Sequence, residues 1–101
     1  MKIVYKRQNL EFEWDSNKAQ SNLKKHGITF EEATEAFFDP FYQTGDATSD
    51  TNFNGEQREF IIGYSLKLRL LLVIFIDKHK SNRIISARLA TKNERKIYEQ
   101  S

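Results

Sequence analysis

The sequence predicts an α+β fold, in which two N-terminal helices pack on a curved antiparallel sheet and a C-terminal helix packs elsewhere. Three apolar segments in the second half are separated by short polar turns, as is typical of antiparallel strands. Two capped helical segments follow one another in the first half. With 101 residues, of which 39% are hydrophobic, the chain has room for one domain and enough apolar material for one core.

The first strand is predicted at residues 10–14, where apolar and acidic side chains alternate, so that the apolar ones share one face. Residues 1–9 show no clear pattern, and we interpret them as an N-terminal arm or an extra strand. Residues 10–101 are then expected to form one domain. We assign four aromatic residues to its core: Phe12, Trp14, Phe30 and Phe37.

Helix signals follow this strand directly. Asp15 is placed to cap a helix over residues 16–26, and Gly27 supplies the left-handed residue that ends it. A second helix begins at Thr29, which opens a T-x-x-E capping box, and Pro40 ends it.

Residues 41–57 are rich in Gly, Asp and Asn, which favours a loop, with a short strand near residues 41–44. Three strands are predicted next, over residues 58–65, 69–76 and 83–88. Thr91 opens a further T-x-x-E box, which predicts a last helix over residues 92–100.

The formal net charge of +2 hides an uneven distribution. Residues 1–50 carry six Lys and Arg against nine Asp and Glu, a balance of −3, whereas residues 51–101 carry ten against five, a balance of +5. Five of these ten cations lie between Arg83 and Lys96. Such a cluster attracts phosphates, although a solvated basic surface explains the same run of charges.

Several functional classes are excluded by composition. The chain has no cysteine and two histidines, which argues against disulfides, thiolate metal sites and a Cys nucleophile. It contains neither a nucleotide-binding glycine motif nor a G-x-S-x-G turn. The longest apolar run, Leu70–Ile76, is far shorter than the roughly 20 residues of a membrane-spanning helix. Because no signal peptide pattern is present, we expect a cytoplasmic protein. With no cysteine and two histidines we expect neither a structural zinc site nor a histidine-rich metal centre, and we expect no cofactor.

His26 is a candidate proton donor, because it lies beside Lys25 where the first helix ends and where helix carbonyls stabilise a protonated imidazole. The alternative is that His26 only hydrogen-bonds those carbonyls. His79 lies in the turn before the last strand, and we interpret it as a surface residue.

Four arginines are candidates for phosphate binding, because the planar guanidinium group matches phosphate oxygens: Arg58, Arg69, Arg83 and Arg88. Strict alternation places Arg83 and Arg88 on opposite faces of their strand, so they share a site only if the strand bulges or twists. Each arginine has the alternative of pairing with a carboxylate, such as Glu59 or Glu94.

Five motifs stand in a specific order and spacing: Phe12-Glu13-Trp14-Asp15, Asn22-Leu23-Lys24-Lys25-His26-Gly27-Ile28 with Phe30-Glu31-Glu32-Ala33, Asp39-Pro40, Arg83-Ile84-Ile85-Ser86-Ala87-Arg88, and Ala90-Thr91 with Glu94-Arg95. In this arrangement the chain resembles the BrnT family of bacterial type II toxins. The resemblance implies a RelE-like fold, a BrnT-like toxin domain over residues 10–101, and metal-independent cleavage of RNA that inhibits translation and growth. It also implies a hetero-oligomer with a cognate BrnA-like antitoxin. In that complex only the antitoxin would contact operator DNA.

The resemblance also implies site residues. By position, the catalytic set is Lys25, His26, Arg58, Arg83 and Arg88. Further RNA contacts are expected from Arg69, Lys92 and Arg95. The chain departs from the family pattern at Gln57, where an acidic residue commonly precedes the arginine, and at Leu89, which is often basic.

Two other hypotheses remain open at this point. A non-catalytic module that binds RNA or DNA would use the same arginines without a proton-transfer pair. A degenerate toxin would act only as a regulator that binds the antitoxin, and the departures at Gln57 and Leu89 favour that idea.

Overall fold

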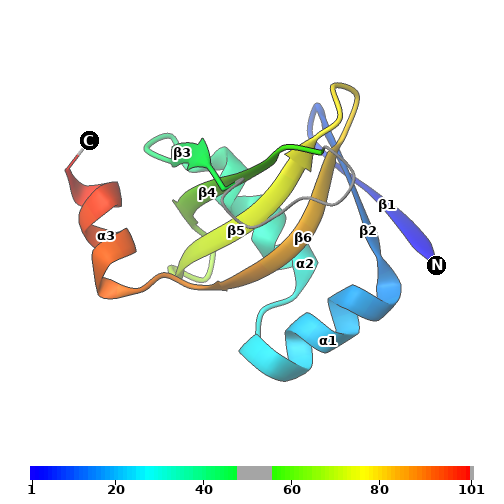
Figure 1. Ribbon diagram of the computed structural model, residues 1–101, viewed down its shortest axis with the longest axis horizontal. Helices are drawn as coiled ribbons and strands as arrows, with labels where there is room; N and C mark the ends of the chain where they lie inside the picture. Colours follow the sequence, from blue (N-terminus) through cyan, green and yellow to red (C-terminus); the bar gives the residue numbers. More distant parts are fainter. Residues whose placement is uncertain (48–55, 101) are drawn as a thin grey trace.

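The computed structural model describes residues 1–47 and 56–100, which form an α+β fold, as predicted (Figure 1). Part of the predicted loop, residues 48–55, lies outside the described residues. The elements in chain order are β1 (Lys2–Arg7), β2 (Leu10–Asp15), α1 (Ser16–His26), α2 (Phe30–Glu35), the 3-10 helix η1 (Ala36–Phe38), β3 (Gln43–Asp46), β4 (Arg58–Tyr64), β5 (Leu70–Asp77), β6 (Asn82–Leu89) and α3 (Lys92–Glu99).

The described strands form one six-stranded sheet in the order β1-β2-β6-β5-β4-β3. Its neighbours are antiparallel except for β2 and β6, which run parallel and pair only at Phe12 with Asn82 and Glu13 with Arg83. The prediction of an all-antiparallel sheet is therefore wrong at this pair. Residues 1–9 contribute β1, which pairs with β2 along its whole length.

The local signals at the helix ends act as expected. The Asp15 carboxylate accepts the backbone N–H of Lys18, and the backbone of Gly27 is left-handed, with φ of 73°. The Thr29 hydroxyl accepts the N–H of Glu32 at 3.0 Å. After Glu35 the second helix tightens into η1, so its α-helical part is shorter than predicted.

One face of the sheet packs against α2 and η1, and we call it the helix-covered face. η1 lies so close to β4 that a Cβ atom on Gly63 would stand 2.6 Å from the Ala36 carbonyl oxygen, which explains a glycine inside this strand. The buried core here comprises Phe12, Trp14, Ile28, Phe30, Ala33, Ala36, Ile61, Leu71, Val73, Phe75, Ile84 and Ala87, with Phe37 packed against it.

Two strands precede the helices, in agreement with the predicted strand at residues 10–14 and the possible extra strand in residues 1–9. The position of the first helix differs from the prediction, because α1 lies beside the edge of β6 instead of across the sheet (Figure 1). The Asn22 side chain explains this position, because its amide donates to the Ala87 carbonyl at 2.8 Å and accepts the Ala87 N–H at 3.1 Å. α1 thus takes the place of a strand beside the second half of β6.

The opposite face carries the side chains of Arg58, Phe60, Ile62, Leu72, Ile74, Ile76, Arg83, Ser86 and Arg88, and we call it the arginine face. α3 packs on part of it, where the Tyr98 ring meets the Tyr64 ring with centroids 5.4 Å apart. The Tyr98 hydroxyl donates to Asp39 at 2.7 Å. Burial, together with this hydrogen bond, raises the pKa of Tyr98 to about 12.

Candidate functional site

A β-bulge in β6 places Arg83 and Arg88 on the same face. Ile74 of β5 pairs with Ser86 and Phe75 pairs with Ile84, so Ile85 has no partner in the β5 register. Ile84 and Ala87, three residues apart, are consequently both buried in the core. Their neighbours Arg83 and Arg88 therefore both project from the arginine face. The sequence alone did not decide whether this strand bulges, and the structure shows that it does.

Arg83 is held by a carboxylate from β2. Its Nη1 donates to Glu13 Oε2 at 3.3 Å, and Glu13 also contacts Ser81 at 3.0 Å and Lys2 at 3.4 Å. Burial disfavours the Glu13 anion, but the hydrogen bonds from Ser81 and Lys2 outweigh it and lower the pKa of Glu13. Sequence reasoning missed Glu13 as the partner of Arg83, because the two lie 70 residues apart.

Arg88 makes a tighter ion pair. Its two terminal nitrogens donate to the two oxygens of Glu94, at 2.8 and 2.9 Å. The same carboxylate accepts the N–H of Thr91 at 2.9 Å and thereby completes the capping box of α3. The hydrogen bond from Arg88 lowers the pKa of Glu94. The alternative of pairing with Glu94 is therefore confirmed for Arg88, which links this arginine to the start of α3.

Arg58 begins β4 and lies in the same cross-strand row as Arg83. In this row Arg58 pairs with Ile76 of β5, Ile76 pairs with Arg83 of β6, and Arg83 pairs with Glu13 of β2. Arg58 and Arg83 therefore stand on either side of one apolar residue. The structure brings together three of the five predicted catalytic residues on this face.

Lys25 and His26 line a groove between α1 and β6. The groove has a volume of about 320 Å³, and its other lining residues are Asn17, Lys18, Ser21, Asn22, Ile85 and Ser86. No arginine lines it. Ser86 connects the two parts of the site, because it lies on the arginine face between Arg83 and Arg88 and also lines this groove.

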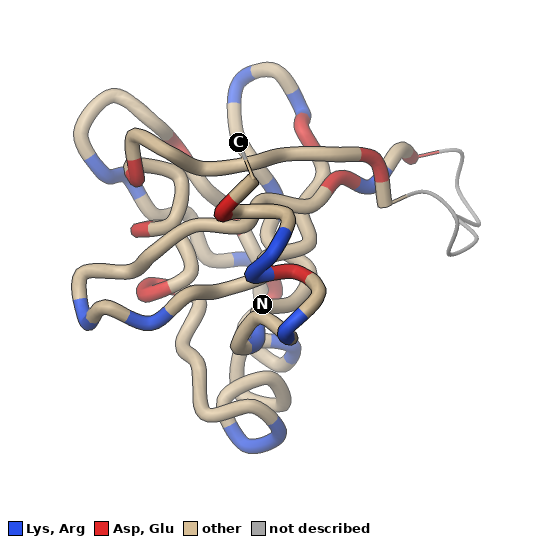
Figure 2. The backbone as a smooth tube through the Cα atoms, turned by 90° about the vertical axis from the view of Figure 1, so that its left-hand side faces the viewer, with Lys and Arg blue, Asp and Glu red and all other residues tan. Residues whose placement is uncertain are grey.

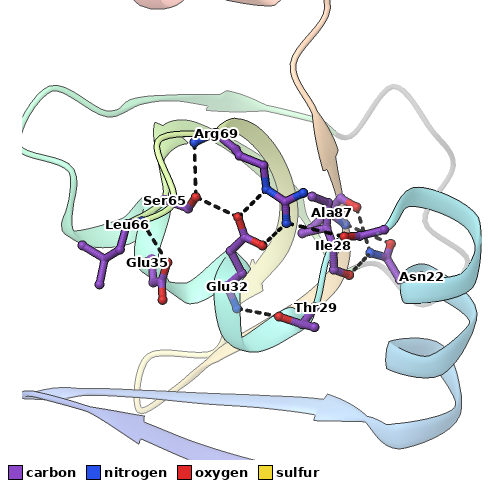
Figure 3. Close-up of polar contacts among 10 residues, drawn as sticks. Asn22, Ile28, Thr29, Glu32, Glu35, Ser65, Leu66, Arg69 and Ala87 are labelled. Carbon is purple, nitrogen blue, oxygen red and sulfur yellow. Dashed lines mark hydrogen bonds and ion pairs between the residues drawn. The ribbon is translucent and has the colours of Figure 1, made fainter.

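Arg69 has a different environment, on the α2 side of the molecule (Figure 3). Its guanidinium makes a two-point ion pair with Glu32, which is only 4% exposed, and it also reaches the Gly27 carbonyl at 3.5 Å. The Ser65 hydroxyl donates to the same carboxylate at 2.8 Å. Arg69 lowers the pKa of Glu32. This arginine joins α2 to the β4–β5 turn and contacts the residue after His26, but it does not lie on the arginine face with Arg58, Arg83 and Arg88.

The remaining cations that we expect to contact RNA lie on α3, and His79, interpreted as a surface residue, lies in the β5–β6 turn. Lys92 and Arg95 are on α3, where Arg95 donates to the Tyr64 hydroxyl at 3.1 Å. His79 is exposed in its turn, with a left-handed φ of 69°. Lys92 and Arg95 lie on the helix that packs over the arginine face, whereas His79 stands apart.

The charged side chains that line the groove are all basic. α1 carries Lys18, Lys24 and Lys25 and no acidic residue. Figure 2 shows it at the bottom of the view as a coil with basic positions only. In residues 1–47 and 56–100 no group of three His, Asp or Glu residues is placed to hold a metal ion. None of the helices in those ranges is long and apolar enough to span a membrane.

Comparisons with known proteins place these features in a family context. The sequence model described as "Ribonuclease toxin, BrnT, of type II toxin-antitoxin system" matches residues 14–94. The 1.1 Å crystal structure of the Brucella abortus ribonuclease toxin BrnT superposes with a TM-score of 0.58 at 28% identity. That match covers 78% of this chain and 94% of the Brucella chain. No match was found among curated proteins.

Proposed function

Because the chain belongs to the BrnT ribonuclease toxins of type II toxin-antitoxin systems, we propose that it is a metal-independent endoribonuclease of RelE-like fold that acts in the cytoplasm. The bulge at Ile85 is the observation that carries this proposal, because it gathers Arg83, Ser86 and Arg88 on one face beside the groove of Lys25 and His26.

In the proposed reaction the ribose 2′-oxygen attacks the adjacent phosphorus and loses its proton to a base. The bond from phosphorus to the 5′-oxygen breaks, and this oxygen gains a proton. The products are a 2′,3′-cyclic phosphate and a free 5′-hydroxyl. All atoms of the products come from the RNA and the transferred protons, so the reaction as written consumes no water, metal ion or cofactor. We assign the proton transfers to His26 with Lys25, a type of contribution worth about 10² to 10⁴-fold in rate.

The arginines bind the phosphate charge in this mechanism. Arg83 and Arg88 pair with Ile76 and Leu72, which are four residues apart on β5, so the two arginines are separated by roughly 13 Å along the strand. They therefore reach the scissile phosphate and its neighbour from the two sides of Ser86. Arg58, in the same row as Arg83, positions the strand. For RNA to bind, Glu13 and Glu94 have to give up part of their hydrogen bonding to these guanidinium groups.

The variants His26→Ala, Arg83→Ala and Arg88→Ala test this site. Each is expected to relieve the growth inhibition caused by induced expression while the far-ultraviolet circular dichroism stays that of the parent. Lys67→Ala, in the β4–β5 turn, is the control and should remain toxic. Unchanged toxicity of all three variants at equal expression would refute the assignment.

Purified chain incubated with RNA in EDTA tests the reaction itself. We expect strand scission and fragments that end in a 2′,3′-cyclic phosphate. Binding without scission would instead identify a non-catalytic nucleic-acid-binding module.

We also propose that the chain inhibits translation and is neutralised in a hetero-oligomer by a BrnA-like antitoxin, through which the pair contacts operator DNA. The type II family implies an antitoxin, and exposed cations offer a partner with acidic side chains a complementary surface. Co-expression with the product of the adjacent small gene should yield a complex that does not cleave RNA. Failure of the two proteins to co-purify would count against this partner.

A further inference from the structure

The groove between α1 and β6 has two walls and mostly polar lining residues. One wall is a single face of α1, because Asn17, Lys18, Ser21, Asn22 and Lys25 recur at helical spacing. The other wall is formed by Ile85 and Ser86 of β6. The lining holds two lysines and a histidine and no carboxylate, and Ile85 is its one apolar residue.

The edge of β6 is open to this groove for a structural reason. β2 pairs with β6 only as far as Arg83, and the Asn22 side chain occupies both backbone groups of Ala87. Between these two points lies Ile85, which has no partner in the registers of β2 or β5 in the described chain. The bulge that aligns the arginines therefore also presents a short stretch of strand edge to the groove.

Ser86 lines the groove and, by its register, also lies on the arginine face. An RNA strand whose scissile phosphate lies near Arg83 and Arg88 would therefore place an adjoining nucleotide beside α1. Lys18 lies on that side of the groove as a partner for its phosphate. Asn17 and Ser21 offer the donors and acceptors that read the edge of an unpaired base.

We propose that the α1–β6 groove binds one ribonucleotide next to the scissile phosphate, with Lys18 as a phosphate contact and with Asn17 and Ser21 as specificity-determining residues. This inference rests on the proposed ribonuclease function. It adds Asn17, Lys18 and Ser21, which the sequence analysis did not identify, to the proposed site. Single-stranded RNA is the proposed ligand of the groove.

Binding of a short RNA whose 2′-hydroxyls are all methylated, which blocks attack, tests Lys18 separately from chemistry. Lys18→Ala is expected to weaken this binding about tenfold at low salt, because a charge-assisted contact is lost. It should also reduce the slope of log affinity against log salt by about one. The matched control is Lys24→Ala, which removes the same charge from the same helix outside the groove lining.

Equal affinities of the Lys18→Ala and Lys24→Ala variants would overturn the inference, since charge alone would then explain the binding. If the parent chain fails to cleave RNA but Lys18→Ala weakens binding selectively, the proposed catalysis fails while the groove assignment stands. Loss of antitoxin binding in the Lys18→Ala variant with unchanged RNA affinity would identify the groove as a protein interface and would also overturn the inference.

The double variant Asn17→Ala/Ser21→Ala tests base reading. We expect cleavage at a broader set of sequences, with total cleavage of a mixed-sequence RNA changed less than the distribution of cut sites. An unchanged distribution of cut sites would remove Asn17 and Ser21 from the proposal.

Discussion

Arg69 and the β6 arginines are all bound to carboxylates, yet the two regions use this pairing differently. The Glu32 partner of Arg69 is buried and also bound by Ser65, and the pair joins α2 to the β4–β5 turn. Glu13, the partner of Arg83, is buried as well, but Arg83 makes only one contact with it, of 3.3 Å, and Ser81 and Lys2 bind the same carboxylate. We therefore propose that Arg69 serves the fold, whereas Arg83, held by one long contact, is the more available of the two for binding phosphate.

Glu32→Ala removes the carboxylate of the Arg69–Glu32 pair and should have the largest effect on the free energy of unfolding. The change removes the acceptors of Arg69 and Ser65 from a buried position, and we expect a loss of about 2 kcal/mol in the free energy of unfolding. Denaturant unfolding measures it. Glu31→Ala, one residue away and exposed, is the control and should change the value by less than about 0.5 kcal/mol. Equal effects of the two substitutions would show that the Glu32 pair does not support the fold.

Arg83→Ala should show the opposite pattern. We expect cleavage of RNA to fall about 10²-fold, because a charged donor to the reacting phosphate is lost. The free energy of unfolding should change by less than about 1 kcal/mol, since Arg83 makes a single contact of 3.3 Å and the buried Glu13 keeps its contacts with Ser81 and Lys2. Cleavage kinetics and unfolding of the same preparation are the measurements. If Arg83→Ala lost as much stability as Glu32→Ala and still cleaved RNA, Arg83 would serve the fold and its assignment to RNA binding would be wrong.

Acid should weaken both regions through their carboxylates. Arg69 lowers the pKa of Glu32 and Arg88 lowers that of Glu94, each below the ordinary value of 4.5. In the unfolded chain these groups take up protons first as the pH falls. Their contribution to stability is therefore fully present above pH 4.5 and is lost as the pH falls through the lower folded-state pKa values. Unfolding curves across this range should show the decline, with a shallower slope for Glu32→Gln. An unchanged slope would contradict the linkage.

Arg95→Ala and Lys92→Ala should give the smallest effects. Both residues lie on α3, and we expect each to weaken RNA binding a few-fold and to lower the salt slope by about one, with the rate of cleavage at saturation unchanged. Titration at several salt concentrations measures this. An effect on the saturated rate as large as that of Arg83→Ala would extend the catalytic region to α3.

Features that depend on residues close together in the chain, such as helix caps and strand positions, could be predicted from the sequence. Asp15, Gly27, Thr29 and Thr91 form the expected caps, and β4, β5 and β6 lie within about two residues of the predicted strands. The parallel pairing of β2 with β6 could not be predicted in this way, because it depends on the path of nearly 70 intervening residues.

The site shows the same division between local and distant information. The sequence offered the arginines and the possibility of a bulge, but only the β5–β6 register shows that Ile85 is the extra residue. The predicted partner Glu94 lies six residues from Arg88, within reach of sequence reasoning. Glu13 and Asn22 act across 70 and 65 residues. An inward-facing polar residue on α1, in the helical row of Ala19, is the signal that would have found Asn22.

Nuclear magnetic resonance of the arginine side-chain Nε–Hε groups tests the central claim most directly. The parent chain would be titrated with a short RNA methylated at every 2′-hydroxyl. We predict that the signals of Arg83 and Arg88 shift as the RNA saturates, while the signal of Arg69, bound to Glu32, stays in place. A shift of Arg69 without shifts of Arg83 and Arg88 would contradict the account.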